Sequence, residues 1–290
     1  MIFLQIFING IILGGIYLLI SIGLSFTYAL LRFPNFSHAE LITIGAYTSL
    51  ILCMLNLDFK LTLAASFATS AITALLIHIL AFNPMIKLGM GMVELMIVSI
   101  GIGIIIRHVI QEIWGAKIYF LKIVRQIYEL NGIRIADSEI LILIIAFSSA
   151  LFLHLLLTKT KIGIALRASI ENTNLALSLG VNIDRLTLIT WIIGGGLAGI
   201  GGSLFAFQTR ITPYLGWEVL ISAFASTILG GIGSIYGVIF ASLLLGLCES
   251  FGLKLIVSLG LSSGYRSAIP FLVILVSLLI KPKGLTGGRV

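Results

Sequence analysis

The chain has 290 residues, of which 59% are hydrophobic and only 10% are charged, whereas a soluble domain carries about 25% charged residues. This composition excludes a water-soluble globular protein, because there is too little polar surface to cover one. The net charge of +7 does not indicate nucleic-acid binding, since the basic residues stand in short clusters between apolar runs, as topogenic charges do.

The apolar runs are long enough to cross a membrane, which requires roughly 20 residues per helix. The first one, 2–31, is longer than a signal-peptide core and lacks a basic start, so we expect a membrane helix. The sequence predicts an all-α integral membrane protein, a polytopic bundle of about eight or nine transmembrane helices in one domain over 1–290. The long runs lie at 2–31, 39–57, 61–81, 92–114, 139–157, 187–208, 236–257 and 266–281, with a shorter run at 218–230.

A dense polar cluster separates the first two runs. It follows Pro34, which ends a helix because it has no backbone donor, and it consists of Asn35, Ser37, His38 and Glu40. Two interpretations stay open: an ordinary turn at the membrane surface, or part of a path for a polar solute.

Ionisable residues inside apolar runs need an explanation, since one at a helix centre costs roughly 2.5–3.5 kcal/mol. Glu249 stands near the middle of 236–257, so we expect it to line a path or to pair within the bundle. The others stand nearer the ends of their runs, where long side chains reach the headgroups; they are Arg107, His108, Glu112, His78 and His154. Cys53 and Cys248 each stand alone and are expected to be packing residues.

The longest polar segments are 115–138 and 158–186. The first mixes aromatic and basic residues, as chain on a membrane surface does. In the second, Asn172 is a good N-cap, Gly180 suits the position after a helix, and Asn182 can cap the next helix. The sequence therefore predicts a short, capped helix outside the membrane, either docking into a partner or lying on headgroups.

The basic residues also indicate the membrane topology of the chain, that is, which segments lie on the same side of the membrane. If 158–186 and the tail with Lys281, Lys283 and Arg289 both face the cytoplasm, an even number of crossings must separate them. Three long runs do so, and 218–230 must supply a fourth as a short or broken helix. Such backbone is tolerated only inside protein or facing a cavity, so the flanking Gly230, Gly231 and Gly233 are candidates for a substrate pathway.

Several stretches carry a resemblance to a known family. The segment 167–185 resembles the coupling loop of the LivH-type permeases of branched-chain amino acid ABC importers, and 190–202 resembles the glycine-rich helix after it. Further stretches agree in order and spacing: 35–40 with 45–47, 229–237 and 281–285. The chain departs from the family at Ser37 and Ala39, where Ala and Gly are usual, and at Thr286, where Phe is usual. The first two put the exact solute in doubt.

The resemblance implies a mechanism and a set of partners. An extracytoplasmic amino-acid-binding protein would deliver solute to this chain and a second, LivM-like permease subunit in the cytoplasmic (inner) membrane. Two cytoplasmic ABC ATPase subunits would bind ATP and Mg²⁺, so the chain itself would need no cofactor. Leu175, Ala176, Leu179 and Gly180 would sit in an ATPase groove, flanked by Arg167, Glu171 and Arg185.

Three other functions compete with this one. A permease for urea or short amides belongs to the same family and is not separated by sequence. An ion-coupled secondary transporter calls for buried carboxylates, and Glu249 is a thin supply. An intramembrane enzyme is disfavoured, because the chain contains no H-E-x-x-H or G-x-S-x-G motif. It also has no G-x-x-x-x-G-K-[ST] motif, so ATP hydrolysis would belong to a partner.

Overall fold

The computed structural model describes residues 2–121, 126–130 and 132–286. Arg289 of the basic tail and residues 122–125 and 131 of the polar segment 115–138 lie outside the described residues. Within them, seven helical segments are long and apolar enough to cross a membrane, and two apolar helices are shorter. The prediction of an all-α polytopic membrane bundle is confirmed.

The membrane helices follow the predicted runs closely. The long segments are α1 (Ile2–Leu31), α3 (Phe59–Ile77) continued by a π-helical turn η1 (His78–Phe82) and α4 (Asn83–Lys87), α5 (Met92–Trp114), α6 (Asp137–Lys159), α9 (Ile183–Gln208), α11 (Ile235–Ser258), and the 3₁₀ turn η2 (Ser263–Ser267) with α12 (Ala268–Ile280). The two shorter apolar helices are α2 (His38–Met54) and α10 (Leu215–Gly230).

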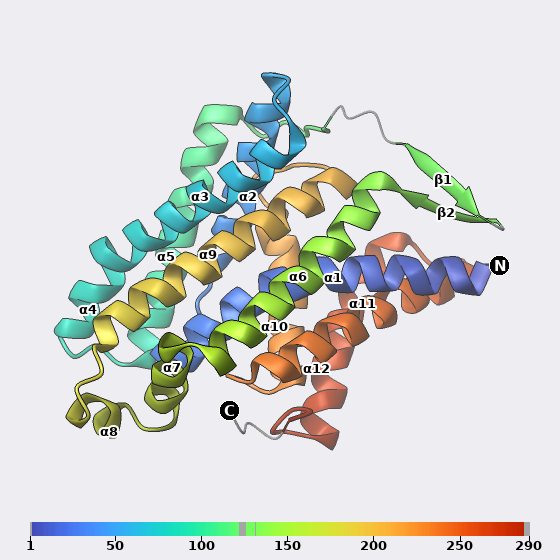
Figure 1. Ribbon diagram of the computed structural model, residues 1–290. Coiled ribbons are helices and arrows are strands. Elements are labelled where there is room, and N and C mark those ends of the chain that lie inside the picture. The colour runs from blue at the N-terminus through green and yellow to red at the C-terminus, as the bar shows by residue number, and fades with distance from the viewer. Residues whose placement is uncertain (1, 122–125, 131, 287–290) are drawn as a thin grey trace.

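The two ends of the bundle differ. One end, the loop face, carries the helices α7 (Lys161–Glu171) and α8 (Thr173–Ser178). The opposite end, the hairpin face, carries the N-terminus and an antiparallel pair of strands, β1 (Ile127–Leu130) and β2 (Ile133–Ala136) (Figure 1). The side chain of Gln5 bonds the backbone of Arg134 at 2.8 and 2.9 Å, which ties the start of α1 to the hairpin. The sequence did not predict these strands, because four-residue strands leave too short an alternation to recognise.

Helices α1 and α9 form the centre of the bundle, where small residues let backbones approach closely. A methyl group on Gly45 of α2 would overlap the backbone of Gly199 in α9, and one on Gly194 would press on Gly23 of α1. In lipid there is no hydrophobic effect to bring helices together, so close van der Waals packing at small residues holds them instead. Packing of this kind accounts for part of the high glycine content of 31 residues.

Two helix pairs repeat one arrangement in opposite directions. The long helix α1 ends at the loop face, and after residues 32–37 the shorter α2 runs back toward the hairpin face. The long helix α9 ends at the hairpin face, and after residues 209–214 the shorter α10 runs back toward the loop face (Figure 1). Inverted repeats of this kind are common in transporters. The sequence shows no convincing repeat, because the arrangement constrains backbone paths more than residue types.

The C-terminal tail lies at the loop face, on the same side of the bundle as the loop 158–186, as the predicted topology requires. His154, near the end of α6, meets the hydroxyl of Tyr236 at the start of α11 at 2.8 Å. Beside it, Leu285 N donates to the carbonyl of Leu229, and Thr286 Oγ1 to that of Gly230, both at 2.8 Å. Residues 209–214 together with α10 therefore supply the fourth traverse of the bundle.

Candidate functional site

The segment 32–37 enters the bundle from the loop face. Arg32 adopts a left-handed backbone conformation (φ 57°), and its Nη2 donates to the carbonyl of Ile170 in α7 at 3.3 Å. Phe33 is buried against Phe82, which stacks on Trp191 of α9. These contacts join the re-entrant segment to the loop 158–186 at one end and to the bundle core at the other.

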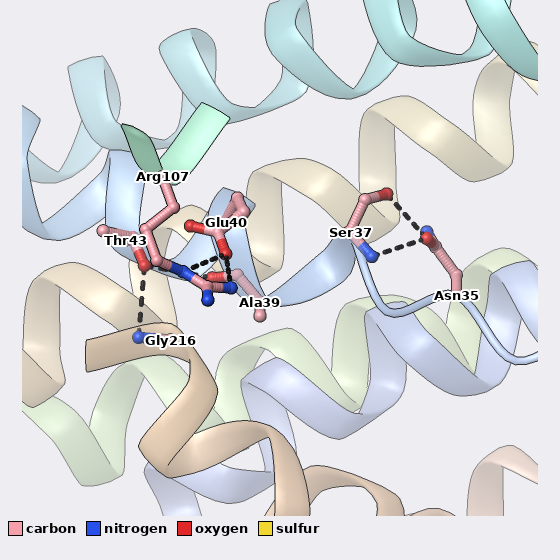
Figure 2. A network of polar contacts seen from close by, with 7 residues as sticks. All are labelled: Asn35, Ser37, Ala39, Glu40, Thr43, Arg107 and Gly216. Carbon is pink, nitrogen blue, oxygen red and sulfur yellow. Dashed lines mark hydrogen bonds and ion pairs between the residues drawn. The ribbon is translucent and has the colours of Figure 1, made fainter. Parts of the chain in front are cut away.

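The polar cluster at the start of α2 lies deep in the bundle. His38 Nε2 is 3.0 Å from the carbonyl of Ile20, a residue roughly 16 Å from the end of α1 at 1.5 Å per residue. Ser37 donates to Asn35 Oδ1 from its amide at 3.1 Å and from its hydroxyl at 2.6 Å (Figure 2). All four members, Asn35, Ser37, His38 and Glu40, are at most 1% exposed. The interpretation as an ordinary turn at the membrane surface is therefore wrong.

An ion pair holds this cluster to α5. Arg107 Nη2 and Nε donate to Glu40 Oε1 at 2.6 and 3.2 Å (Figure 2). The guanidinium also lies over the rings of Trp217 and Tyr214, 4.8 and 5.2 Å from their centroids, a cation–π arrangement that strengthens without water. The prediction that Arg107 reaches the headgroups is wrong, because its side chain is only 11% exposed and is paired with the buried carboxylate of Glu40.

The second shorter helix meets the first at this point. Gly216, at the start of α10, donates its amide to Thr43 Oγ1 at 3.1 Å (Figure 2), and a side chain there would overlap the carbonyl of Ala39. Two buried atoms of the cluster, Glu40 Oε2 and Asn35 Nδ2, have no hydrogen-bond partner among the described residues. An unsatisfied buried polar atom costs about 1–3 kcal/mol, so these atoms suit contact with water or with a polar solute.

Glu249 is the buried member of a second ion pair, nearer the hairpin face. It is 2% exposed, and its Oε2 accepts from the Tyr17 hydroxyl at 2.9 Å and from Arg266 Nε at 3.0 Å. Its Oε1 accepts from Ser222 at 2.9 Å. The sequence left a path role and a bond within the bundle open for Glu249, and these bonds join α1, α10, α11 and η2.

The glycines at 230, 231 and 233 are not part of either buried cluster. They form the turn between α10 and α11 at the loop face, where the C-terminal tail covers them. Gly231 and Gly233 have positive φ angles of 100° and 84°, which glycine adopts without strain. This placement favours a tight turn over a place beside the solute at mid-depth, and the break in backbone regularity falls instead at 209–214, before α10.

The loop 158–186 has the predicted caps. Asn172 Oδ1 accepts from the amide of Leu175, and Asn182 Oδ1 from that of Arg185, both at 3.0 Å. Gly180 has a φ of 82°. Its amide bonds Leu177, and the amide of Val181 bonds Ala176, which is the Schellman pattern of a helix C-terminus. The helix α8 is thereby fixed at both ends.

The faces of α8 differ from the expected docking surface at one residue. Leu175, Leu177 and Leu179 are 56, 53 and 74% exposed, whereas Ala176 is 1% exposed. Ala176 packs inward against its own chain, because it stands on the face of α8 that closes against α7. The predicted contacts of Leu175, Leu179 and Gly180 with a partner remain predictions, and so do those of the exposed Arg167, Glu171 and Arg185.

Sequence reasoning missed four residues of these sites: Arg107 as the partner of Glu40, Arg266 as the partner of Glu249, Arg32 as the link to α7, and Leu177 as a further exposed leucine of α8. One signal was available, since a buried acid inside a membrane protein needs a base, and Arg107 and Arg266 stand in or beside other apolar runs. Which base meets which acid depends on helix packing and is not written locally.

Comparisons with known proteins agree with this architecture. The family model described as "Branched-chain amino acid transport system / permease component" matches residues 6–278. The chain is 33% identical to the probable branched-chain amino acid transport permease protein LivH of Methanocaldococcus jannaschii, covering 96% of this chain and 91% of that protein. It is 31% identical to LivH of Escherichia coli K12, covering 98% and 96%. It is 24% identical to the probable permease protein LivM of M. jannaschii, covering 77% and 74%.

Proposed function

Because the chain belongs to the family of permease components of branched-chain amino acid transport systems, we propose that it passes branched-chain amino acids across the cytoplasmic membrane within an ABC importer. In this assembly two cytoplasmic ATPase subunits bind ATP and Mg²⁺. An extracytoplasmic binding protein delivers the solute. The chain itself is the transport subunit.

The observation that carries this proposal is the outer face of α8. Leu175 and Leu179 are four residues apart and so lie on one side of the helix, where they are 56 and 74% exposed. The helix is fixed by a cap at each end and lies beyond the membrane helices. Exposed apolar side chains clustered on a rigid element are typical of a protein interface. Caps at both ends also reduce fraying of the helix, which helps this short element to keep its shape when a partner pushes on it.

The loop 158–186 lies on the same face as Lys281 and Lys283, and basic residues favour the cytoplasmic side. The ATPases therefore dock at the loop face, and the binding protein at the hairpin face. Arg32 connects the docking loop to the re-entrant segment through its bond to Ile170. Movement of α7 would thus reach Asn35 and Ser37, at the start of α2, through five residues of chain.

We further propose that the second permease subunit is a LivM-like chain and not a second copy. The similarity to LivM of M. jannaschii is weaker than that to LivH of the same organism and covers less of the chain. Two related but distinct permease chains in one organism are what a heterodimer requires.

The test is reconstitution of the chain with its neighbouring ATPases, LivM-like subunit and binding protein in proteoliposomes. We expect uptake of radiolabelled L-leucine that requires ATP and the binding protein, with no uptake of urea or acetamide. Vesicles without the ATPases are the control. Leucine uptake that persists in that control, or uptake of urea in place of leucine, would contradict the proposal.

A further inference from the structure

A cavity of about 630 Å³ opens beside the second ion pair. It lies in the hairpin half of the bundle between α1, α10 and η2, and Glu249 and Arg266 form part of its wall. A second cavity, of about 260 Å³, lies on the other side of the same two residues, near Asn9 and Gln208. The larger volume is in the range of small-molecule sites, about 300–1,000 Å³.

The two members of the pair differ in what they offer to a ligand. The Glu249 carboxylate is buried, and both of its oxygens already accept hydrogen bonds. The Arg266 side chain is 37% exposed; its Nε donates to Glu249, and the Tyr17 hydroxyl lies close to the guanidinium. Its two terminal nitrogens are therefore available to a ligand in the cavity that the side chain lines.

A partly exposed guanidinium is costly against hydrocarbon, so this cavity suits water or a polar solute better than lipid tails. The fork of Arg266 has the geometry that binds a carboxylate through two parallel hydrogen bonds. The wall also contains apolar surface for a side chain, including Phe205, Val219 and Trp217, beside the exposed ion pair of Arg210 and Glu218. A charged fork beside an apolar wall matches a small apolar amino acid.

We propose that Arg266 binds the α-carboxylate of the transported solute in this cavity, and that Glu249 positions the guanidinium through its Nε. The inference rests on the proposed function. It adds a recognition site in the hairpin half of the membrane, which the solute meets before it reaches the polar cluster at the start of α2. Leucinamide, which lacks the carboxylate, would bind poorly.

The experiment measures equilibrium binding of radiolabelled L-leucine to the whole transporter in nanodiscs without the binding protein. In Arg266→Lys the charge beside Glu249 remains but the fork is lost, and we expect the Kd for leucine to rise about tenfold, as for loss of one charge-assisted hydrogen bond. The matched control is Arg134→Lys, on the same face but in β2 and outside the cavity, with an unchanged Kd. Leucinamide should compete at least tenfold more weakly than leucine.

A second variant separates binding from a structural role. Glu249→Gln keeps an amide oxygen that can accept from Nε and hold the guanidinium in place, while the charge of the guanidinium is no longer compensated, so the Kd should fall. An equal Kd in Arg266→Lys and Arg134→Lys would overturn the inference, as would a rise in both Arg266→Lys and Glu249→Gln or equal competition by leucinamide. If any of these three outcomes is found while the unaltered transporter still takes up leucine, the inference fails and the proposed function stands. If the unaltered transporter takes up no leucine, the inference and the proposed function both fail.

Discussion

The loop 158–186 and the polar cluster at the start of α2 each place side chains in an unfavourable environment, but in opposite ways. The loop leaves three leucines exposed outside the membrane, and local caps hold its shape. The cluster buries a charged pair inside the bundle, and residues from α2, α5 and α10 hold it. An exposed apolar face needs a partner from another chain, whereas a buried charge needs one from its own chain. Substitutions in the loop should therefore impair coupling, and those in the cluster should impair folding.

The largest effect is expected from Glu40→Ala. Removing one partner of a buried ion pair costs about 3–5 kcal/mol, because the other charge is left unpaired. We expect the free energy of unfolding in detergent to fall by that amount. The matched control is Glu218→Ala, which breaks the exposed pair with Arg210 and should cost less than about 1 kcal/mol.

Replacing both partners, as in Glu40→Leu with Arg107→Met, should recover most of this stability, since apolar pairs often replace buried ion pairs without loss. Recovery of stability without recovery of leucine uptake would assign the pair a role in transport as well as in folding. Equal losses in Glu40→Ala and Glu218→Ala would remove the distinction drawn between the two regions.

The next effect is expected from Leu179→Glu in the loop. If Leu179 is a hot spot of the proposed ATPase interface, its loss costs about 2 kcal/mol, and ATP-driven leucine uptake should fall roughly 30-fold while the chain inserts and folds normally. Leu88→Glu makes the same change at another exposed leucine of the loop face, between α4 and α5, and should leave uptake intact. Co-purification of the ATPases reports the lost contact directly.

For Ala176→Asp we expect a different failure. Ala176 is 1% exposed, so a carboxylate there is forced into the packing between α8 and the rest of the chain. The loop should unfold locally, with faster proteolysis of residues 158–186, even when no ATPase is present. Resistance to protease equal to that of Leu179→Glu would contradict the inward placement of this residue.

A smaller effect is expected from Asn172→Ala. It removes the side chain that accepts from the amide of Leu175, and loss of an N-cap costs about 1 kcal/mol. We expect faster hydrogen exchange at the amides of α8 and a partial loss of uptake. Asn174→Ala, in the same helix but not at its cap, should leave both unchanged, since Ala favours a helix.

The smallest effect is expected from Arg32→Ala. The native Arg32 joins the loop to the segment that leads into the cluster. Its bond to Ile170 is 3.3 Å long and exposed, so its loss should change the stability by less than about 1 kcal/mol. If Arg32 carries movement from the loop to the cluster, uptake per ATP hydrolysed should fall while ATP hydrolysis persists. Lys87→Ala, which removes an exposed basic residue from the same face, should change neither rate.

The sequence alone determined the features that depend on neighbouring residues. The apolar runs set the membrane helices, because lipid demands about 20 apolar residues for each crossing. Asn172, Gly180 and Asn182 set the ends of α8 and the start of α9, because a cap acts on amides within three residues of itself. The need for a fourth traverse near 218–230 also followed from the order of basic segments along the chain.

Only the tertiary structure decided how the buried charges are paired and where the re-entrant segments lie. Glu40 and Arg107 are 67 residues apart in the chain, and Tyr17 and Glu249 are 232 apart, so no local pattern records these contacts. Their choice depends on how glycine-lined helices pack, which fixes the depth of each side chain. The inward turn of Ala176 and the open fork of Arg266 likewise follow from the position of a neighbouring helix, which the residue type does not reveal.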